Sequence, residues 1–441
     1  MASRGQFSSR IGFILAAAGS AVGLGNIWGF PTKVAENGGA AFVLMYLIMA
    51  FLLAYPVLMA ELIIGRAKRA NMIDALRSIS GNAFGSIVGS AGAITVIFIL
   101  AFYSIVAGWM FSHLIDAVLS IITVDLPWLT DSSIARNIIF MCIFLAFTCA
   151  VVIGGVSGGI EKWSVRLMPT LLILIIALIL YVSFQDGAID GWKAFLIPDF
   201  ARAVEPGLLV DAMGQAFFSM SLGVGTMLVY GSYIQKNESL PRLGASVALV
   251  DIGVAILAGM LIIPAMYVAL NNGVEIFIGD KLIEGPTLIF QVLPSLFATM
   301  GFVGTFVASA FFALMVIAAL TSSISMLEVP VAYLVDNKGL RRKRATVLIT
   351  VLVFALSTII VLNFDVLFGL VISITTEYSQ PILGLFLCIF AGWIWKRNEI
   401  LGELKQGNVS IEQSVFWKIW PWYVKFVCPV VIAVMFYRSV F

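Results

Sequence analysis

Residues 19–26 read Gly-Ser-Ala-Val-Gly-Leu-Gly-Asn, which places three glycines inside the first apolar stretch of the chain. Residues 219–226, in the sixth apolar stretch, repeat the feature as Ser-Met-Ser-Leu-Gly-Val-Gly-Thr. Such runs favour local unwinding of a membrane-spanning helix, which frees carbonyl groups for a cation and amide groups for an anion. Two of them in corresponding positions predict an inverted-repeat transporter. Close helix packing is the alternative role for the glycines.

The rest of the chain has the composition of a membrane protein. Of its 441 residues, 61% are hydrophobic and 11% are charged, whereas soluble domains carry about 25% charge. One crossing needs roughly 20 apolar residues. Eleven stretches qualify, at residues 11–31, 40–65, 84–119, 134–154, 165–184, 207–233, 243–271, 297–335, 345–363, 366–395 and 417–441. We therefore expect an all-α polytopic membrane protein with 11 transmembrane helices.

The positions of Lys and Arg predict the orientation. With a cytoplasmic N-terminus, nineteen of the 26 basic residues fall in inner segments and six in outer segments, as the positive-inside rule requires. Eleven crossings then place the C-terminus outside, and we expect a multi-pass protein of the cell inner membrane. The basic run 341–344 is assigned to topology and lipid contact. The net charge of +2 gives no reason to expect nucleic acid as a partner.

Two carboxylates within the spans are candidates for function, because ionised groups in a membrane are costly. We expect Glu61 to accept hydrogen bonds from amide groups left unpaired where the sixth stretch unwinds. Asp251 requires a cation, and sodium is favoured. The Thr-Ser-Ser run at 321–323 supplies hydroxyl oxygens to helix carbonyls or to a small cation. The sequence has no nucleotide-binding loop or nucleophile motif, so an enzyme is not expected.

Four motifs carry a resemblance to a known family. They are Ala-Val-Gly-Leu-Gly-Asn at 21–26, Phe-Pro at 30–31, Ala-Glu-Asn-Gly-Gly at 35–39 and Leu-Thr-Ser-Ser at 320–323. From Arg4 to at least Pro381, the chain resembles the neurotransmitter:sodium symporter family with the LeuT fold, and its eleven helices resemble the bacterial amino-acid symporters of that family. The resemblance implies a 5+5 inverted repeat with broken helices 1 and 6. Its parts are 1–184, 207–395 and a last helix at 417–441.

The resemblance also implies two sodium ions, carried over position by position. The first would be bound by the Ala21 carbonyl, Asn26, Ser219 and Asp251, with the substrate carboxylate completing the shell. The second would be bound by the carbonyls of Gly19, Val22 and Ala318 and the hydroxyls of Thr321 and Ser322. Many members have Asn where Asp251 stands, and animal members add chloride nearby. Because a fixed carboxylate supplies that negative charge, we expect transport without a chloride requirement.

An α-amino acid is the substrate that the resemblance favours. Gly23 is Asp in monoamine-transporting members, so a glycine here leaves room for a substrate that brings its own carboxylate. That carboxylate would meet the amides of Leu24 and Gly25 and the Tyr103 hydroxyl. The ammonium would meet the carbonyls of Ala21, Phe218 and Ser219. The side-chain pocket would consist of Ile99, Phe218, Ser221, Val224, Ser322 and Met326.

Since that pocket is mostly apolar, we expect hydrophobic or aromatic L-amino acids, imported by alternating access. Two alternatives remain open. One is sodium-coupled symport of another zwitterion or osmolyte, such as a betaine. The other is a substrate sensor that does not transport. We expect a monomer or a weak dimer in the lipid bilayer.

Gate residues follow from the same resemblance. At the inner gate, Arg4 would pair with Asp336 beside Tyr233 and Phe7. At the outer gate the usual arginine is Gly29, which leaves the expected helix-10 carboxylate, Asp365, without its cation. Lys33, about one turn further along the helix, is the candidate substitute.

Helix 5 has a feature of its own. Gly159 and Pro169 enclose nine residues and match a Gly-x9-Pro pattern linked in this family to local unwinding of helix 5. A proline inside a helix removes one backbone hydrogen bond, which gives that helix a physical reason to open.

Overall fold

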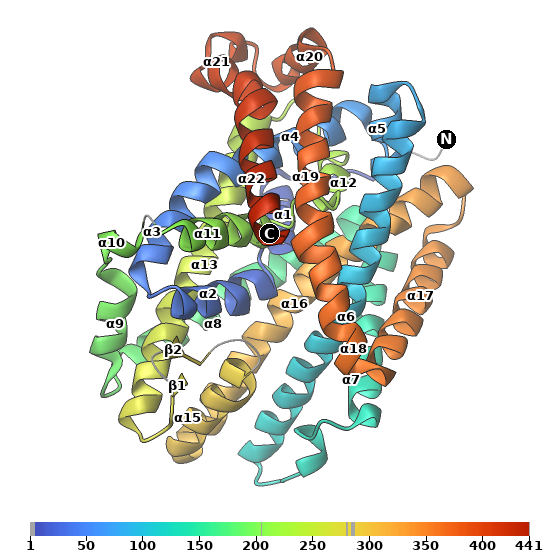
Figure 1. Ribbon diagram of the computed structural model, residues 1–441. Helices are drawn as coiled ribbons and strands as arrows, with labels where there is room; N and C mark the ends of the chain where they lie inside the picture. Colours follow the sequence, from blue (N-terminus) through green and yellow to red (C-terminus); the bar gives the residue numbers. More distant parts are fainter. Residues whose placement is uncertain (1–4, 204, 279–280, 284–286, 441) are drawn as a thin grey trace.

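The chain is almost entirely helical in the computed structural model, which describes residues 5–203, 205–278, 281–283 and 287–440 (Figure 1). The one pair of strands in the described part, β1 (Phe277–Ile278) and β2 (Lys281–Leu282), is a short antiparallel hairpin. The prediction of an all-α membrane fold is therefore confirmed in all but this hairpin.

The α-helices are α1 (Arg10–Ala21), α2 (Phe30–Glu36), α3 (Ala40–Met49), α4 (Tyr55–Lys68), α5 (Met72–Ser80), α6 (Ala83–Ile121), α7 (Ile134–Ile153), α8 (Lys162–Ser183), α9 (Ala188–Leu196), α10 (Phe200–Ala203), α11 (Pro206–Ser219), α12 (Thr226–Gly231), α13 (Leu240–Asn271), α15 (Leu293–Thr299), α16 (Gly301–Lys338), α17 (Arg342–Leu362), α18 (Phe364–Ile372), α19 (Gln380–Ile389), α20 (Arg397–Gly407), α21 (Val415–Trp422) and α22 (Cys428–Val440). Wider π-helical turns join several of them, at Gly25–Gly29, Ala50–Ala54, Val156–Glu161, Leu288–Val292, Ser373–Ser379, Phe390–Ile394 and Tyr423–Val427.

Nine helices of the described chain are long and apolar enough to cross a membrane, or ten when one bent pair counts as a single span. That pair joins Arg10–Ala21 to Gly25–Glu36 at an angle of 54°. The sixth predicted stretch is divided into α11 and α12, of 14 and 6 residues, and neither part is long enough to be counted. The total of eleven crossings and the boundaries of the two repeats stay predictions.

Two of the helices are much longer than a bilayer requires. Helix α6 has 39 residues and α16 has 38, which is about 57 Å of helix each. They pack along each other in the middle of the molecule (Figure 1). A helix of this length must tilt or extend beyond the hydrocarbon, as the lengths of the third and eighth stretches predict.

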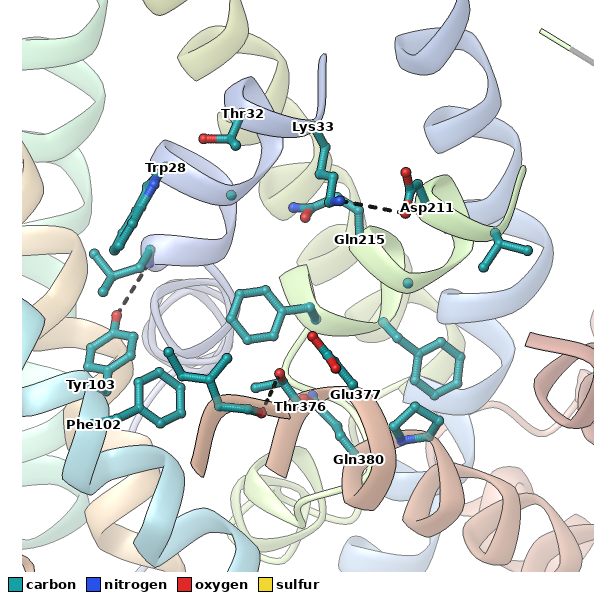
Figure 2. A pocket seen from close by; sticks show the side chains of 18 of the residues that line it. Trp28, Thr32, Lys33, Phe102, Tyr103, Asp211, Gln215, Thr376, Glu377 and Gln380 are labelled. Atoms are coloured by element: carbon teal, nitrogen blue, oxygen red, sulfur yellow. Dashed lines mark hydrogen bonds and ion pairs between the residues drawn. The ribbon is translucent and has the colours of Figure 1, made fainter. Parts of the chain in front are cut away.

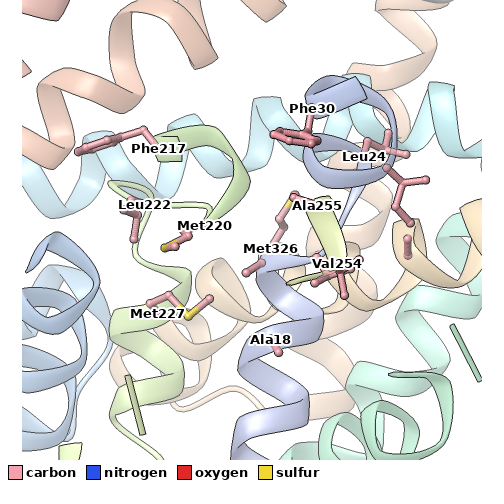
Figure 3. Close-up of a cluster of buried hydrophobic side chains, with 14 of the residues drawn as sticks. Ala18, Leu24, Phe30, Phe217, Met220, Leu222, Met227, Val254, Ala255 and Met326 are labelled. Atoms are coloured by element: carbon pink, nitrogen blue, oxygen red, sulfur yellow. The ribbon is translucent and has the colours of Figure 1, made fainter. Parts of the chain in front are cut away.

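Both predicted helix breaks are present, and the backbone explains the second. Helix α11 ends at Ser219, and three residues before α12 have positive φ angles, Ser221 at 51°, Gly223 at 89° and Gly225 at 81°. Glycine adopts this left-handed region without steric cost. A side chain at Gly223 would also collide with the Gln380 carbonyl. Figure 3 shows the buried apolar side chains around the two breaks, with Phe30 and Leu24 on one side and Phe217, Met220 and Leu222 on the other.

Candidate substrate and sodium sites

Glu61 on α4 holds the unwound segment of the sixth span in place. Its side chain is fully buried. One carboxylate oxygen accepts a hydrogen bond from the Gly223 amide at 2.7 Å, and the other accepts one from the Leu228 amide at 3.1 Å. These amides belong to the break and to the first turn of α12, where a helix leaves donors unpaired. The role predicted for Glu61 is confirmed.

A polar cluster joins the first break to α13 and contains three of the four residues predicted for the first sodium. The Asn26 side-chain amide donates hydrogen bonds to the Asp251 carboxylate at 2.7 Å and to the Ser219 hydroxyl at 2.9 Å. Ser219 in turn donates to the second Asp251 oxygen at 2.9 Å. All three side chains are buried. The Asn26 amide nitrogen faces the carboxylate and hydroxyl oxygens, while its Oδ1 atom accepts a hydrogen bond from the Gly23 amide at 3.3 Å. The three side chains carry one carboxylate, one amide and one hydroxyl, whose oxygens are ligands that a small hard cation binds.

A second cluster forms where α16 faces the end of α1. The Ser322 hydroxyl donates hydrogen bonds toward the carbonyls of Val22 at 3.1 Å and Gly19 at 3.3 Å. The Thr321 hydroxyl donates to the Ala318 carbonyl at 3.0 Å. The structure therefore brings all five residues predicted for the second sodium to one place. The helix break makes this possible, because Val22 lies just past the end of α1 and its carbonyl is free to turn toward α16.

Between the two breaks lies a small central cavity of about 20 Å³. It is lined by Ala21, Gly23, Leu24, Gly25, Val96, Ile99, Tyr103, Phe218, Ser221, Val224, Ser322, Met326 and Gln380. Every residue predicted for the substrate lines it except Ser219, which belongs to the adjoining polar cluster. The volume has room for about one water molecule, so the lining must rearrange before a larger ligand enters.

The position of Gly23 limits what this cavity can bind. A Cβ atom there would lie 2.9 Å from the Tyr103 hydroxyl oxygen and would collide with the Ser322 hydroxyl. The Leu24 amide donates a hydrogen bond to the same Tyr103 oxygen at 3.3 Å. A backbone amide and a phenol hydroxyl thus lie side by side at the N-terminal end of the second half of the broken helix, the kind of place where anionic groups bind.

Comparison with known proteins identifies the family. The sequence pattern of the sodium:neurotransmitter symporter family matches residues 4–137 and 132–441. The chain belongs to this family. It is 34% identical to an uncharacterised sodium-dependent transporter of Bacillus subtilis, over 98% of this chain and 96% of that one. It is 32% identical to a sodium-dependent transporter of Haemophilus influenzae, over 99% and 98% of the two chains.

A solved structure agrees with the sequence comparison. The crystal structure of MhsT in complex with L-phenylalanine superposes with a TM-score of 0.87, at 34% identity and over the whole of both chains. The expected LeuT fold is confirmed. The protein is a sodium-coupled, multi-pass membrane transporter for a small molecule, and it is not an enzyme.

The transporter has a second, larger cavity of about 560 Å³ beside the central one (Figure 2). We call it the vestibule. Leu24, Tyr103, Phe218 and Gln380 line both cavities and form the wall between them. Four charged residues also line the vestibule, namely Lys33, Asp211, Glu377 and Arg438.

The outer gate differs from the expectation. Lys33 pairs with Glu36 at 2.7 Å and with Asp211 of α11 at 3.6 Å, not with Asp365. The tenth predicted span, which we call helix 10, consists of α18, the π-helical turn Ser373–Ser379 and α19. Of its carboxylates in the described chain, Glu377 lines the vestibule, whereas Asp365 is exposed in the first turn of α18. Gly29 lies beside the Gln215 side-chain amide, which donates a hydrogen bond to the Gly25 carbonyl at 2.7 Å.

The inner gate is held by a network that extends beyond the predicted residues. Arg4 lies outside the described residues, and Asp336 accepts a hydrogen bond from the Asn71 amide at 3.2 Å. The Tyr233 hydroxyl donates to buried Glu328 at 2.6 Å, and Arg342 binds the same carboxylate. The expected lipid contact is wrong for Arg342, because its guanidinium binds Glu328 and the Val152 carbonyl, and its contribution to topology stays a prediction.

The helix-5 motif also has an unexpected neighbour. Gly159 lies in the π-helical turn Val156–Glu161, and Pro169 lies inside α8, so the helix is wound between them. Glu161, within this turn, accepts hydrogen bonds from the amides of Ser8 at 2.7 Å and Ser9 at 3.1 Å. Glu161 and Glu328 are not among the residues predicted from the sequence. Their signal is the same as that of Glu61, a carboxylate in or next to an apolar stretch.

Proposed function

We propose that this transporter imports α-amino acids together with two sodium ions by alternating access, with hydrophobic or aromatic side chains favoured and without chloride. The observation that supports this most strongly is the crowding at Gly23. A Cβ atom there would collide with Ser322 and approach Tyr103 to 2.9 Å, so the packing around Gly23 is matched to a residue without a side chain. This favours a ligand that brings its own carboxylate, as an α-amino acid does. The L-phenylalanine bound to MhsT is consistent with this class.

Sodium is a co-transported ion in this scheme. The Ala21 carbonyl, Asn26, Ser219 and Asp251 would hold the first ion next to the substrate carboxylate. Each ligand then stabilises the binding of the other, which is the thermodynamic basis of coupling. An ion that enters down 100 mV contributes roughly 2.3 kcal/mol before its concentration gradient is counted. We place the protein in the cell inner membrane as a monomer or weak dimer, with a cytoplasmic N-terminus and an external C-terminus.

The first test is thermal stabilisation of the purified protein by each of the twenty amino acids and by glycine betaine, in sodium and in potassium. We expect sodium-dependent stabilisation by a few apolar or aromatic amino acids. A response to betaine alone would replace the amino acid by another zwitterion. Uptake into liposomes under a sodium gradient follows, because a sensor would bind the same ligand without accumulating it.

Asp251 provides the test of the ion requirement. In the wild type, exchange of chloride for gluconate should leave sodium-dependent binding unchanged. Asp251→Asn should weaken sodium binding by about 3 kcal/mol, or roughly a hundredfold, because it removes the buried charge. Asp365→Asn, which neutralises an exposed carboxylate, is the control. Chloride dependence in the wild type would contradict the proposal.

A further inference from the structure

Gln380 is a polar residue in the wall of the substrate cavity, contributed by helix 10. It is the first residue of α19, directly after the π-helical turn Ser373–Ser379. Its exposed fraction is 3%. It lines the vestibule, as Figure 2 shows, and also the central cavity. The unwound segment fixes its backbone, since a side chain at Gly223 would collide with the Gln380 carbonyl.

The other polar side chains of the central cavity already have partners. The Tyr103 hydroxyl accepts a hydrogen bond from the Leu24 amide. Ser221 donates to the Ser20 carbonyl at 3.4 Å, and Ser322 donates to the Val22 carbonyl at 3.1 Å. In contrast, no group of the described chain donates to the buried Oε1 atom of Gln380. The rest of the lining consists of backbone and the side chains of Val96, Ile99, Phe218, Val224 and Met326, with Leu24 and Ala21.

One unpaired amide oxygen, in a lining whose other polar side chains have partners, has a consequence for selectivity. A ligand that brings a methyl or ring C–H toward Gln380 leaves the buried oxygen unpaired, whereas a ligand with an O–H or N–H group satisfies it. Sites of this kind discriminate strongly against analogues that lack the polar group. A hydroxyl can donate to Oε1 or accept from the amide nitrogen, so it pairs with either end of the side chain.

We propose that Gln380 makes the site select amino acids whose mainly apolar side chain carries a hydroxyl or N–H group over their purely apolar counterparts. This inference rests on the proposed amino-acid symport. Gln380 acts as a specificity residue, contributed by a helix that the sequence analysis did not place at the substrate.

The test compares two nearly isosteric pairs, tyrosine with phenylalanine and threonine with valine. Binding to the purified full-length protein in sodium is measured for the wild type and for Gln380→Leu, which keeps the size and removes the amide. Thr376→Val is the matched control. It lies four residues earlier on the same helix and lines the vestibule but not the central cavity, and its hydroxyl donates to the Ile372 carbonyl at 2.8 Å.

In the pair that binds more tightly, we expect the wild type to prefer the hydroxyl-bearing member by about tenfold. Gln380→Leu should bring this ratio to about one while it still binds the apolar member, which shows that the variant is folded. Thr376→Val should keep the wild-type ratio. Equal binding within both pairs by the wild type, or an unchanged ratio in Gln380→Leu, overturns the role of Gln380 and leaves amino-acid symport intact. If none of the four amino acids binds to the wild type, the proposed symport fails, and this inference fails with it.

Discussion

The two faces of the transporter are held in different ways. The face at the N-terminal segment, which we call the closed face, is sealed by buried carboxylates. Glu161 binds Ser8 and Ser9, and Glu328 binds Tyr233 and Arg342. The Glu161–Ser8 and Glu328–Tyr233 contacts connect segments that are far apart in the sequence.

The vestibule face has no comparable seal in the described part of the chain. Its ion pairs join Lys33 to Glu36 and Asp211, and all three side chains are about one-third exposed. The Lys33–Glu36 pair lies within α2, and the Lys33–Asp211 pair ties α2 to α11, the halves of the broken helices on this side. They do not reach across the vestibule to helix 10. Ion pairs and hydrogen bonds therefore join different elements at the closed face, whereas the pairs of the vestibule face leave that cavity unspanned.

The largest effect is expected from Glu328→Gln, which removes the charge of a buried carboxylate at the closed face. Glu328 is fully buried, and removal of one partner from a buried ion pair costs about 3–5 kcal/mol. The Phe7 amide, which donates to the Tyr233 carbonyl at 3.2 Å, should then exchange with solvent at least about a hundredfold faster. Hydrogen exchange followed by mass spectrometry measures this. Arg341→Gln, one residue before Arg342 and exposed, should have no effect. Equal exchange in Glu328→Gln and the wild type would show that this pair does not hold the face closed.

Glu161→Gln should have the next largest effect. The Glu161 carboxylate accepts four hydrogen bonds, two from amides and two from hydroxyls of Ser8 and Ser9. The neutral amide places an N–H group against these donors. We expect the free energy that holds the N-terminal segment on this side chain to fall by about 2 kcal/mol. Exchange of the Ser8 and Ser9 amides should become roughly thirtyfold faster.

Lys162→Gln is the control for this change, because Lys162 is the next residue and is exposed. Since Glu161 lies between Gly159 and Pro169, unwinding of helix 5 would also release the N-terminal segment. If exchange accelerates equally in both variants, the carboxylate is not the anchor.

The sequence predicted well what depends on local residue types. Glycines and hydroxyls in the middle of two spans predicted the positions of the breaks. A carboxylate within the membrane needs hydrogen-bond donors, and the amides of Gly223 and Leu228 donate to Glu61. The two groups of residues carried over for sodium also lie together, because each group lies on or next to a break.

Long-range pairing was not predictable in the same way. Glu328 and Arg342 meet because the end of α16 and the start of α17 turn back on each other, which a basic run alone does not reveal. Glu377 lies inside the π-helical turn Ser373–Ser379 of helix 10, where side chains depart from an ordinary helical period. Asp365 lies about 18 Å along the helix from Glu377, so the expected carboxylate was at the wrong depth.

The smallest effect is expected from Gly29→Arg, which would sharpen the comparison by adding a cation to the vestibule face. The substitution should be tolerated, because Gly29 has an ordinary helical φ of −59° and an added Cβ would lie 3.4 Å from the Gln215 side chain. The new guanidinium has Glu377 and Asp211 within the same cavity, but an exposed ion pair contributes only about 0–1 kcal/mol. We expect amide exchange across α11 to slow by up to about fivefold. Gly29→Met adds length without charge and should not produce this slowing. If Arg and Met act alike, bulk rather than charge closes the vestibule, and the absence of an arginine at this position would not explain why this face is open.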